Sequence, residues 1–189
     1  MGKKILLASA AAAGGLLAVS NAMVNIALRR KAAPQAPKLG AAAQEGWLSD
    51  AKYITHRNCE DMRLRAWFVP QAGRRYAVIC HGYGCCGQQM LHRAKPFYDM
   101  GFNVLLPDAR AHGGSDGSTI GMGWPERRDI VEWVYEILRR DDQAQIVLFG
   151  ESMGAATVMM AAGEVLPAHG NRVVEDSGYT SAWEQVKAS

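Results

Sequence analysis

From residue 52 onward the chain contains two kinds of hydrophobic pattern. Residues 52–57 and 63–70 alternate apolar and polar positions on either side of the polar stretch 58–61, which predicts a β-hairpin. Three later runs are almost continuously apolar, as expected of strands buried on both faces of a parallel sheet. These runs are residues 76–80, 103–106 and 145–149.

Helical patterns separate the later strands. Pro125 suits a first helical turn, and apolar side chains recur at spacings of three and four up to residue 140, which predicts a helix over 125–140. A second helix is predicted over 153–164, before a short strand at 172–175. This alternation predicts an α/β fold: a mostly parallel sheet with helices on both faces and functional sites at the carboxyl ends of the strands.

The N-terminal segment has a different pattern, because no residue from Ile5 to Leu28 is charged. A helix of this length reaches about 36 Å, enough to cross a bilayer core. Basic residues flank it on both sides, which leaves its orientation open. We expect residues 1–31 to form a membrane anchor, because the apolar run continues past the small-x-small sequence at 20–22. A signal segment cleaved there, which gives a secreted protein, is the alternative.

Composition and charge narrow the function. The chain has 189 residues, 49% of them hydrophobic and 21% charged, which is typical of one globular domain. Residues 1–38 hold six basic residues and no acid, so the remainder is mildly acidic, with 15 basic against 18 acidic residues. A mildly acidic body argues against nucleic-acid binding. Residues 32–46 are small and aperiodic and are predicted to be a linker.

The strongest motif is Gly-Glu-Ser-Met-Gly at residues 150–154, directly after one predicted strand and directly before a predicted helix. Such a tight turn forces Ser152 into a strained backbone conformation that costs about 1–3 kcal/mol. Glycine at positions 150 and 154 avoids clashes with neighbouring backbone. The motif therefore predicts an exposed serine nucleophile that faces the free N–H groups of a helix start.

Two further motifs follow strands. His-Gly-Tyr-Gly at residues 81–84 follows one, and Pro-Asp-Ala-Arg-Ala-His-Gly-Gly-Ser at residues 107–115 follows the next. Together with the serine turn, these motifs occur in the same order as in the α/β-hydrolase superfamily. The chain therefore resembles the N-terminal portion of that superfamily's bacterial serine esterase, lipase and peptidase-like branch. The resemblance covers about residues 50–183. It implies that residues 47–189 form an α/β-hydrolase domain that is incomplete at its C-terminus and lacks its last strands.

The resemblance also implies roles for single residues. Ser152 matches the nucleophile, and the backbone N–H groups of Met153 and Tyr83 match the two donors of an oxyanion hole. His81 matches a histidine that supports its loop and is not a base. No cofactor and no metal ion is implied.

Three further residues are expected to be structural. Asp108 and Arg110 are predicted to hold their turn together and not to touch substrate. Trp124, just before the predicted helix at 125, is interpreted as a packing residue.

The catalytic base is missing from the motifs. The resemblance implies the chain order serine, acid, histidine, but His169 is the only histidine after Ser152, and its predicted loop lies at the opposite edge of the sheet. Asp176 follows the last predicted strand and is a weak candidate for the acid. We therefore expect the acid and the histidine beyond residue 189, and we expect the 189-residue chain alone to be inactive.

These observations lead to two hypotheses. The first is a membrane-tethered serine hydrolase that transfers the acyl group of a small-molecule carboxylic ester to Ser152. The second is a non-catalytic, membrane-anchored binding or scaffold protein that keeps a relic hydrolase pocket without its histidine.

Overall fold

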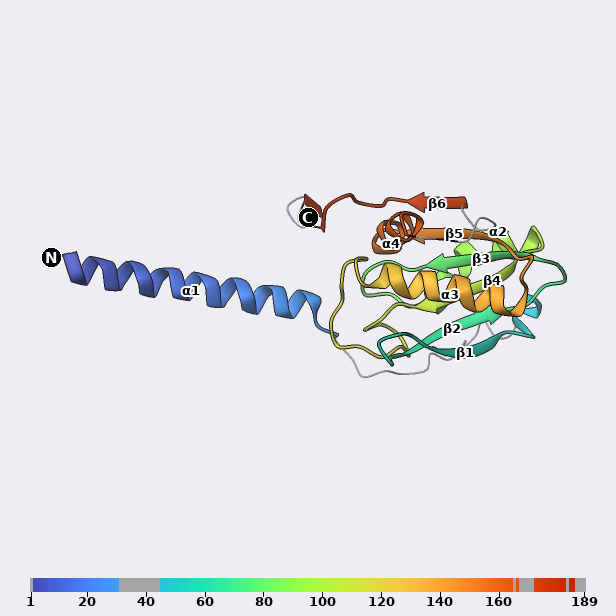
Figure 1. Ribbon diagram of the computed structural model, residues 1–189, viewed down its shortest axis with the longest axis horizontal. Helices are drawn as coiled ribbons and strands as arrows, with labels where there is room; N and C mark the ends of the chain where they lie inside the picture. Colours follow the sequence, from blue (N-terminus) through green and yellow to red (C-terminus); the bar gives the residue numbers. More distant parts are fainter. Residues whose placement is uncertain (1, 31–44, 165, 167–171, 183, 186–189) are drawn as a thin grey trace.

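The computed structural model describes residues 2–30, 45–164, 166, 172–182 and 184–185. His169 and most of the predicted linker lie outside the described residues, so these two predictions are not tested. A long helix, α1 (Gly2–Leu28), projects from the end of an α/β domain (Figure 1).

The domain is built on a six-stranded sheet in the order β1-β2-β4-β3-β5-β6. The predicted hairpin forms β1 and β2, and β2 pairs antiparallel with β4. From β4 through β3 and β5 to β6 all neighbours are parallel. The strands are β1 (Lys52–Arg57), β2 (Arg63–Val69), β3 (Arg75–Cys80), β4 (Asn103–Asp108), β5 (Gln145–Glu151) and β6 (Arg172–Asp176). The predicted mostly parallel α/β sheet is confirmed.

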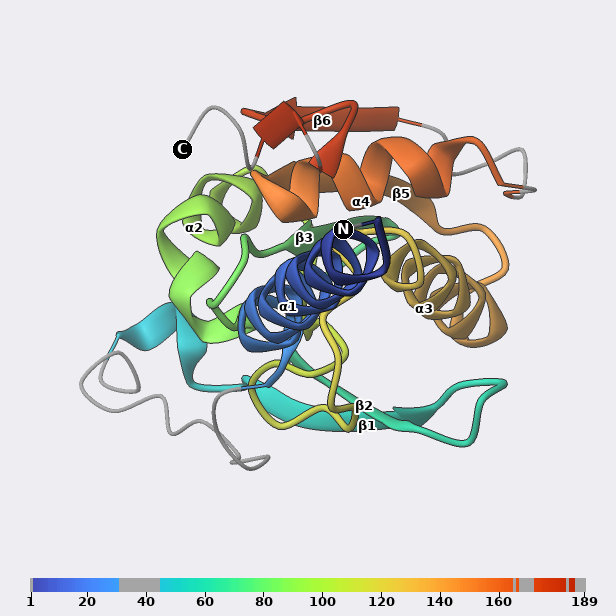
Figure 2. The ribbon, with the colours of Figure 1, turned by 90° about the vertical axis from the view of Figure 1, so that its left-hand side faces the viewer.

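Helices cover both faces of the sheet. The two predicted helices are present as α3 (Glu126–Arg140) and α4 (Met153–Ala162). Sequence analysis missed α2 (Leu91–Asp99), which carries Pro96 inside the helix. Short 3-10 turns, η2 (Gly46–Leu48) and η3 (Gly87–Met90), precede β1 and α2. Figure 2 shows α2 and α3 on opposite sides of the sheet.

Strand β3 is apolar at successive positions because helices pack against both of its faces. Ala77 and Ile79 pack in the cluster that includes Ala94 of α2. Val78 and Cys80, on the alternate positions, pack in the cluster that includes side chains of α3 and α4. A strand with neighbours on both faces therefore needs apolar residues at every position, which explains why its pattern does not alternate.

All parallel strands end at one edge of the sheet. The arrowheads of β3 and β6 in Figure 1 point toward the end of the domain from which α1 projects. The segments after β3, β4, β5 and β6 therefore gather at this edge, where open α/β sheets bind their ligands.

The predicted membrane crossing is not supported. Within the described residues, no helix has both the length and the apolar character that a bilayer crossing requires. The helical conformation predicted for this segment is present.

Candidate active site

The turn from β5 to α4 holds Ser152 in the strained conformation that the motif predicts. Its backbone angles are φ 55° and ψ −115°, in the left-handed half of conformational space that serine rarely occupies. The Ser152 N–H donates to the carbonyl of Asp176 (2.9 Å), and the Ser152 carbonyl accepts from Ala156 N–H (3.1 Å). The end of β6 and the first turn of α4 therefore fix the strained residue from both sides.

The two glycines of the motif allow this turn to form. A Cβ on Gly150 would lie 2.2 Å from the carbonyl oxygen of Gly154, and a Cβ on Gly154 would lie 2.3 Å from the carbonyl oxygen of Cys80. Both contacts are with backbone, which cannot move aside as a flexible side chain can. Strand β3, strand β5 and helix α4 meet here at a spacing that only glycine permits.

Replacement of Gly154 by alanine is expected to lower the free energy of unfolding by about 1–3 kcal/mol, because the added methyl group forces α4 away from β3. Gly163→Ala is the matched control, at the C-terminal end of the same helix. Its Cβ would lie 3.4 Å from the Met160 carbonyl oxygen, which is an ordinary van der Waals distance. Urea unfolding of both variants measures the difference. Equal stability of the two would contradict the close approach.

The His-Gly-Tyr-Gly loop lies beside the serine. A Cβ on Gly82 would sit 3.4 Å from the Ser152 Cβ and 3.9 Å from its Oγ. Tyr83 is the next residue in this loop, and Met153 is the buried first residue of α4. The two predicted oxyanion donors therefore belong to the two segments that flank Ser152.

His81 has no free ring nitrogen. Because the N–H of Ala109 donates to Nε2 (3.0 Å), the proton must sit on Nδ1, which donates to the carbonyl of Gly82 (2.7 Å). Burial, together with the neighbouring His112, lowers the pKa of His81 to about 3. A neutral imidazole with both nitrogens engaged supports the loop and cannot act as a base for Ser152, in agreement with the sequence prediction.

His112 repeats this arrangement from the opposite side. Its Nε2 accepts from Gly84 N–H (3.1 Å), and its Nδ1 donates to the carbonyl of Arg110 (3.0 Å). Its ring lies 5.0 Å from that of His81, edge to face. Burial lowers the pKa of His112. The two neutral histidines therefore connect the loop after β3 to the loop after β4.

Asp108 and Arg110 are structural, as predicted. The buried carboxylate of Asp108 accepts backbone N–H donors from Gly87 and Gly114, each at 2.8 Å. The buried guanidinium of Arg110 binds both carboxylate oxygens of Asp129 on α3, at 2.7 and 2.8 Å. Neither side chain is free to contact a substrate while these bonds hold.

Arg93 of α2 was missed by sequence analysis. It donates to Glu151, the residue before Ser152 (2.8 Å), and to Asp176 (2.7 Å). The carboxylate of Asp176 also accepts from the hydroxyl of Ser177. Asp176 is therefore paired with an arginine and not with a histidine of the described residues. Nothing in the sequence signals this pairing, because Arg93 lies in the helix that was not predicted.

The interpretation of Trp124 as a packing residue is wrong. Its side chain is 64% exposed, and the guanidinium of Arg127 lies 3.6 Å from its ring centre. Trp124 instead lines a mainly apolar cleft of about 420 Å³. The other lining residues are Gly121, Met122, Ala156, Met159, Met160, Tyr179, Thr180 and Ala182. Ala156 places this cleft one helical turn from Ser152 along α4.

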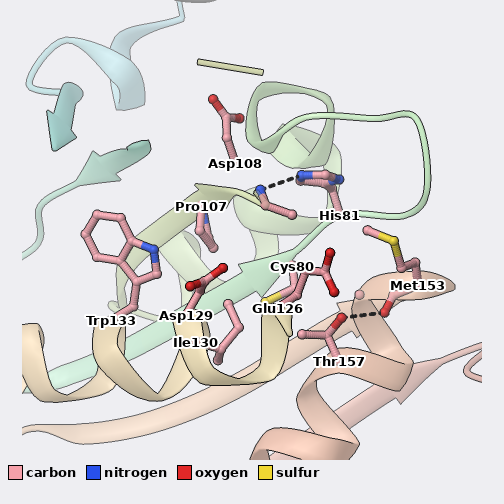
Figure 3. Close-up of a pocket in the computed structure, with 12 residues that line it drawn as sticks. Cys80, His81, Pro107, Asp108, Glu126, Asp129, Ile130, Trp133, Met153 and Thr157 are labelled. Carbon is pink, nitrogen blue, oxygen red and sulfur yellow. Dashed lines mark hydrogen bonds between the residues drawn. The ribbon is translucent and has the colours of Figure 1, made fainter. Parts of the chain in front are cut away.

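A second, much smaller cavity lies under the serine turn. Figure 3 shows Glu126, Asp129, Met153 and Thr157 around it, between α3 and α4. Its volume is about 20 Å³, which is room for one water molecule and not for a substrate. This cavity is therefore not the substrate site.

Comparison with known protein families decides the relationship. The family model for serine aminopeptidases, S33, matches residues 71–174, which is more than half of the chain and includes all three motifs. The chain belongs to this family. The α/β-hydrolase resemblance predicted from the motifs is confirmed.

Relatives and solved structures agree with membership of the S33 family. YqkD of Bacillus subtilis is 36% identical over 87 residues, covering 46% of this chain and 28% of the relative. YfhR of Escherichia coli O157:H7 is 27% identical over 126 residues, covering 62% and 43%. The chain thus spans less than half the length of these curated relatives.

Two solved structures show the same fold. An esterase of Pyrococcus furiosus, Pf2001, superposes with a TM-score of 0.67 at 24% identity, covering 77% of this chain and 56% of that one. XC6422 of Xanthomonas campestris, described as an α/β serine hydrolase without a lid, superposes with a TM-score of 0.54 at 20% identity, covering 60% and 56%. At these identities the likeness concerns the fold alone.

Proposed function

We propose that this S33 family member is a serine hydrolase that cleaves carboxylic esters by acyl transfer to Ser152. The observation that carries the proposal is the strained turn that holds Ser152 at φ 55° and ψ −115° between β5 and α4, with Gly150 and Gly154 at close backbone approaches. Strain of this kind persists where a side chain must be presented to a substrate.

In the proposed reaction the Ser152 Oγ forms a bond to the ester carbonyl carbon and gives its proton to a base. The backbone N–H groups of Met153 and Tyr83 stabilise the resulting oxyanion, a contribution of about 3–4 kcal/mol per donor in other enzymes. The alcohol leaves with a proton, and water then hydrolyses the acyl-enzyme. The apolar cleft that starts one turn along α4 supports a substrate with an apolar group.

The base and its acid partner are proposed to lie outside the described residues, beyond residue 189. Two observations support this. Both ring nitrogens of His81 and of His112 are engaged by the backbone, and His56 pairs with Glu132 (3.0 Å) on α3. The remaining described histidine, His92, is exposed on α2, where its Nδ1 lies 3.0 Å from the carbonyl oxygen of Gln89. In addition, the curated relatives are more than twice as long as the segments that this chain matches.

The natural gene product is expected to hydrolyse p-nitrophenyl acyl esters, with turnover that rises as the acyl chain lengthens to fill the apolar cleft. An aminoacyl p-nitroanilide is the matched substrate, since its amide tests the peptidase activity in the family's name. Preference for the ester supports the proposal. Cleavage of the anilide alone would indicate that the substrate is a peptide and not an ester. If neither substrate were turned over, the result would count against a hydrolase.

A further inference from the structure

Helix α1 carries an apolar surface that the domain does not cover. Six of its large apolar side chains are between 55% and 71% exposed. At about 100° per residue they fall within one half of the helix circumference, interrupted only by small side chains. These residues are called the apolar arc: Leu16, Leu17, Val19, Met23, Val24 and Ile26.

From Gly14 to Ala27, the opposite half of α1 carries only polar or small side chains. Asn21 and Asn25 lie one turn apart on this side, and the Asn25 Nδ2 donates to the backbone carbonyl (2.7 Å) and the Oδ1 (3.1 Å) of Asn21. Small residues occupy the rest of this half: Gly14, Gly15, Ala18 and Ala22. Over this stretch α1 therefore has one apolar half and one polar or small half, an arrangement that can lie at the boundary between lipid and water.

The charge of this segment indicates which partner covers the apolar arc. The first 38 residues hold six basic residues and no acidic one, and Arg29 directly follows α1 with its side chain exposed. A second copy of the chain would bring a second basic segment alongside the first. An anionic lipid surface instead complements the charge and accepts the apolar side chains.

The end of α1 is fixed to the rim of the Ser152 site. The hydroxyl of Tyr83, the residue predicted to supply an oxyanion donor, donates to the carbonyl of Ala27. Ile120 N–H donates to the carbonyl of Leu28 (2.7 Å). The last turn of α1 therefore binds both the loop that lies beside Ser152 and the loop that follows β4.

Arg30 strengthens this attachment. Its backbone N–H donates to the carbonyl of Ser118 (2.9 Å), and its guanidinium donates to the carbonyls of Gly113 and Ser115. In Figure 2 α1 stands in front of the edge where the parallel strands end. Whatever surface α1 enters is therefore held next to the entrance of the Ser152 site.

We infer that α1 inserts its apolar arc into an anionic lipid surface, and that the Ser152 site acts on esters of amphiphilic lipids presented there. The second part rests on the proposed function, whereas the first does not. The attachment of the last turn of α1 to the rim places such a surface beside the loops that flank Ser152.

Flotation with vesicles tests the lipid surface. The natural gene product is expected to float with phosphatidylcholine vesicles that contain phosphatidylglycerol, and more weakly with phosphatidylcholine alone. Leu16→Gln/Met23→Gln, in the centre of the apolar arc, is expected to lower the partition coefficient at least tenfold. Ala18→Gln/Ala22→Gln, which places the same residues on the opposite half, is expected to lower it less than twofold.

The inference would be overturned if the unaltered protein did not float, or if the two variants floated equally. It would also be overturned if sedimentation without vesicles showed a dimer that the substitutions in the apolar arc dissociate and the substitutions on the opposite half do not. Hydrolysis separates the two proposals. Binding to vesicles without turnover of any ester refutes the proposed function alone. Turnover of a soluble ester without vesicle binding refutes the lipid surface alone. If both hold, the variant in the apolar arc loses turnover of a vesicle-embedded ester at least tenfold and keeps turnover of the soluble one.

Discussion

Replacement of Ser152 by alanine is expected to lower ester turnover by about 10⁶-fold, because removal of the nucleophile of a serine hydrolase leaves only binding and oxyanion stabilisation. The backbone at position 152 stays strained in the variant, so its fold and its substrate affinity are expected to change little. Steady-state hydrolysis of a p-nitrophenyl ester, with circular dichroism of both proteins, measures the two effects separately.

Ser49→Ala is the control for this substitution, since Ser49 is exposed in the turn before β1. Its turnover is expected to match that of the unaltered protein. In other enzymes, loss of a single oxyanion-hole donor already lowers turnover by about one hundredfold or more. Loss of the nucleophile must lower it further. A Ser152→Ala variant that keeps more than about one hundredth of the activity would therefore show that the nucleophile is another residue.

Replacement of Asp129 by alanine is expected to give the largest loss of stability, about 3–5 kcal/mol of unfolding free energy. Asp129 is buried, accepts from the Nε and Nη2 of Arg110, and accepts from the amide of Asn58 (2.8 Å). Its removal leaves the buried charge of Arg110 with only Glu60, which is a partly solvated partner. Urea unfolding at neutral pH measures the loss.

Glu60→Ala is the matched control, because it removes the other carboxylate on Arg110 from an exposed position. Exposed ion pairs contribute about 0–1 kcal/mol, so this variant is expected to remain within that range. Asp129→Asn, which keeps the shape and one acceptor, is expected to fall between the two and remains measurable if Asp129→Ala does not fold. Equal losses for Glu60→Ala and Asp129→Ala would contradict the importance of this buried pair.

The backbone geometry of the site was predictable because each motif is local. The turn at Ser152 depends on five consecutive residues whose backbone geometry glycine dictates, and the loop with His81 follows directly from the end of β3. Such features need only the order of strand, turn and helix. The buried strands were predicted for a similar reason, since short, continuously apolar runs bounded by turn residues are typical of strands covered on both faces.

What was missed depends on contacts between distant segments. Arg93 meets Glu151 and Asp176 only after α2 and the sheet have packed, and α2 itself was hidden by Pro96, which usually ends a helix. The exposure of Trp124 depends on how the loop before α3 lies against α4. The polar and small side of α1 between Gly14 and Ala27 was overlooked because two asparagines among alanines weigh little until the helix places them on one side.

The central claim is that Ser152 is an activated nucleophile. Reaction of the natural gene product with a fluorophosphonate, followed by mass spectrometry of the digested protein, tests it most directly. We expect one phosphonylated peptide, the one that contains Ser152, and no adduct in the Ser152→Ala variant. No adduct on the natural protein, or an adduct that persists in Ser152→Ala, would contradict it.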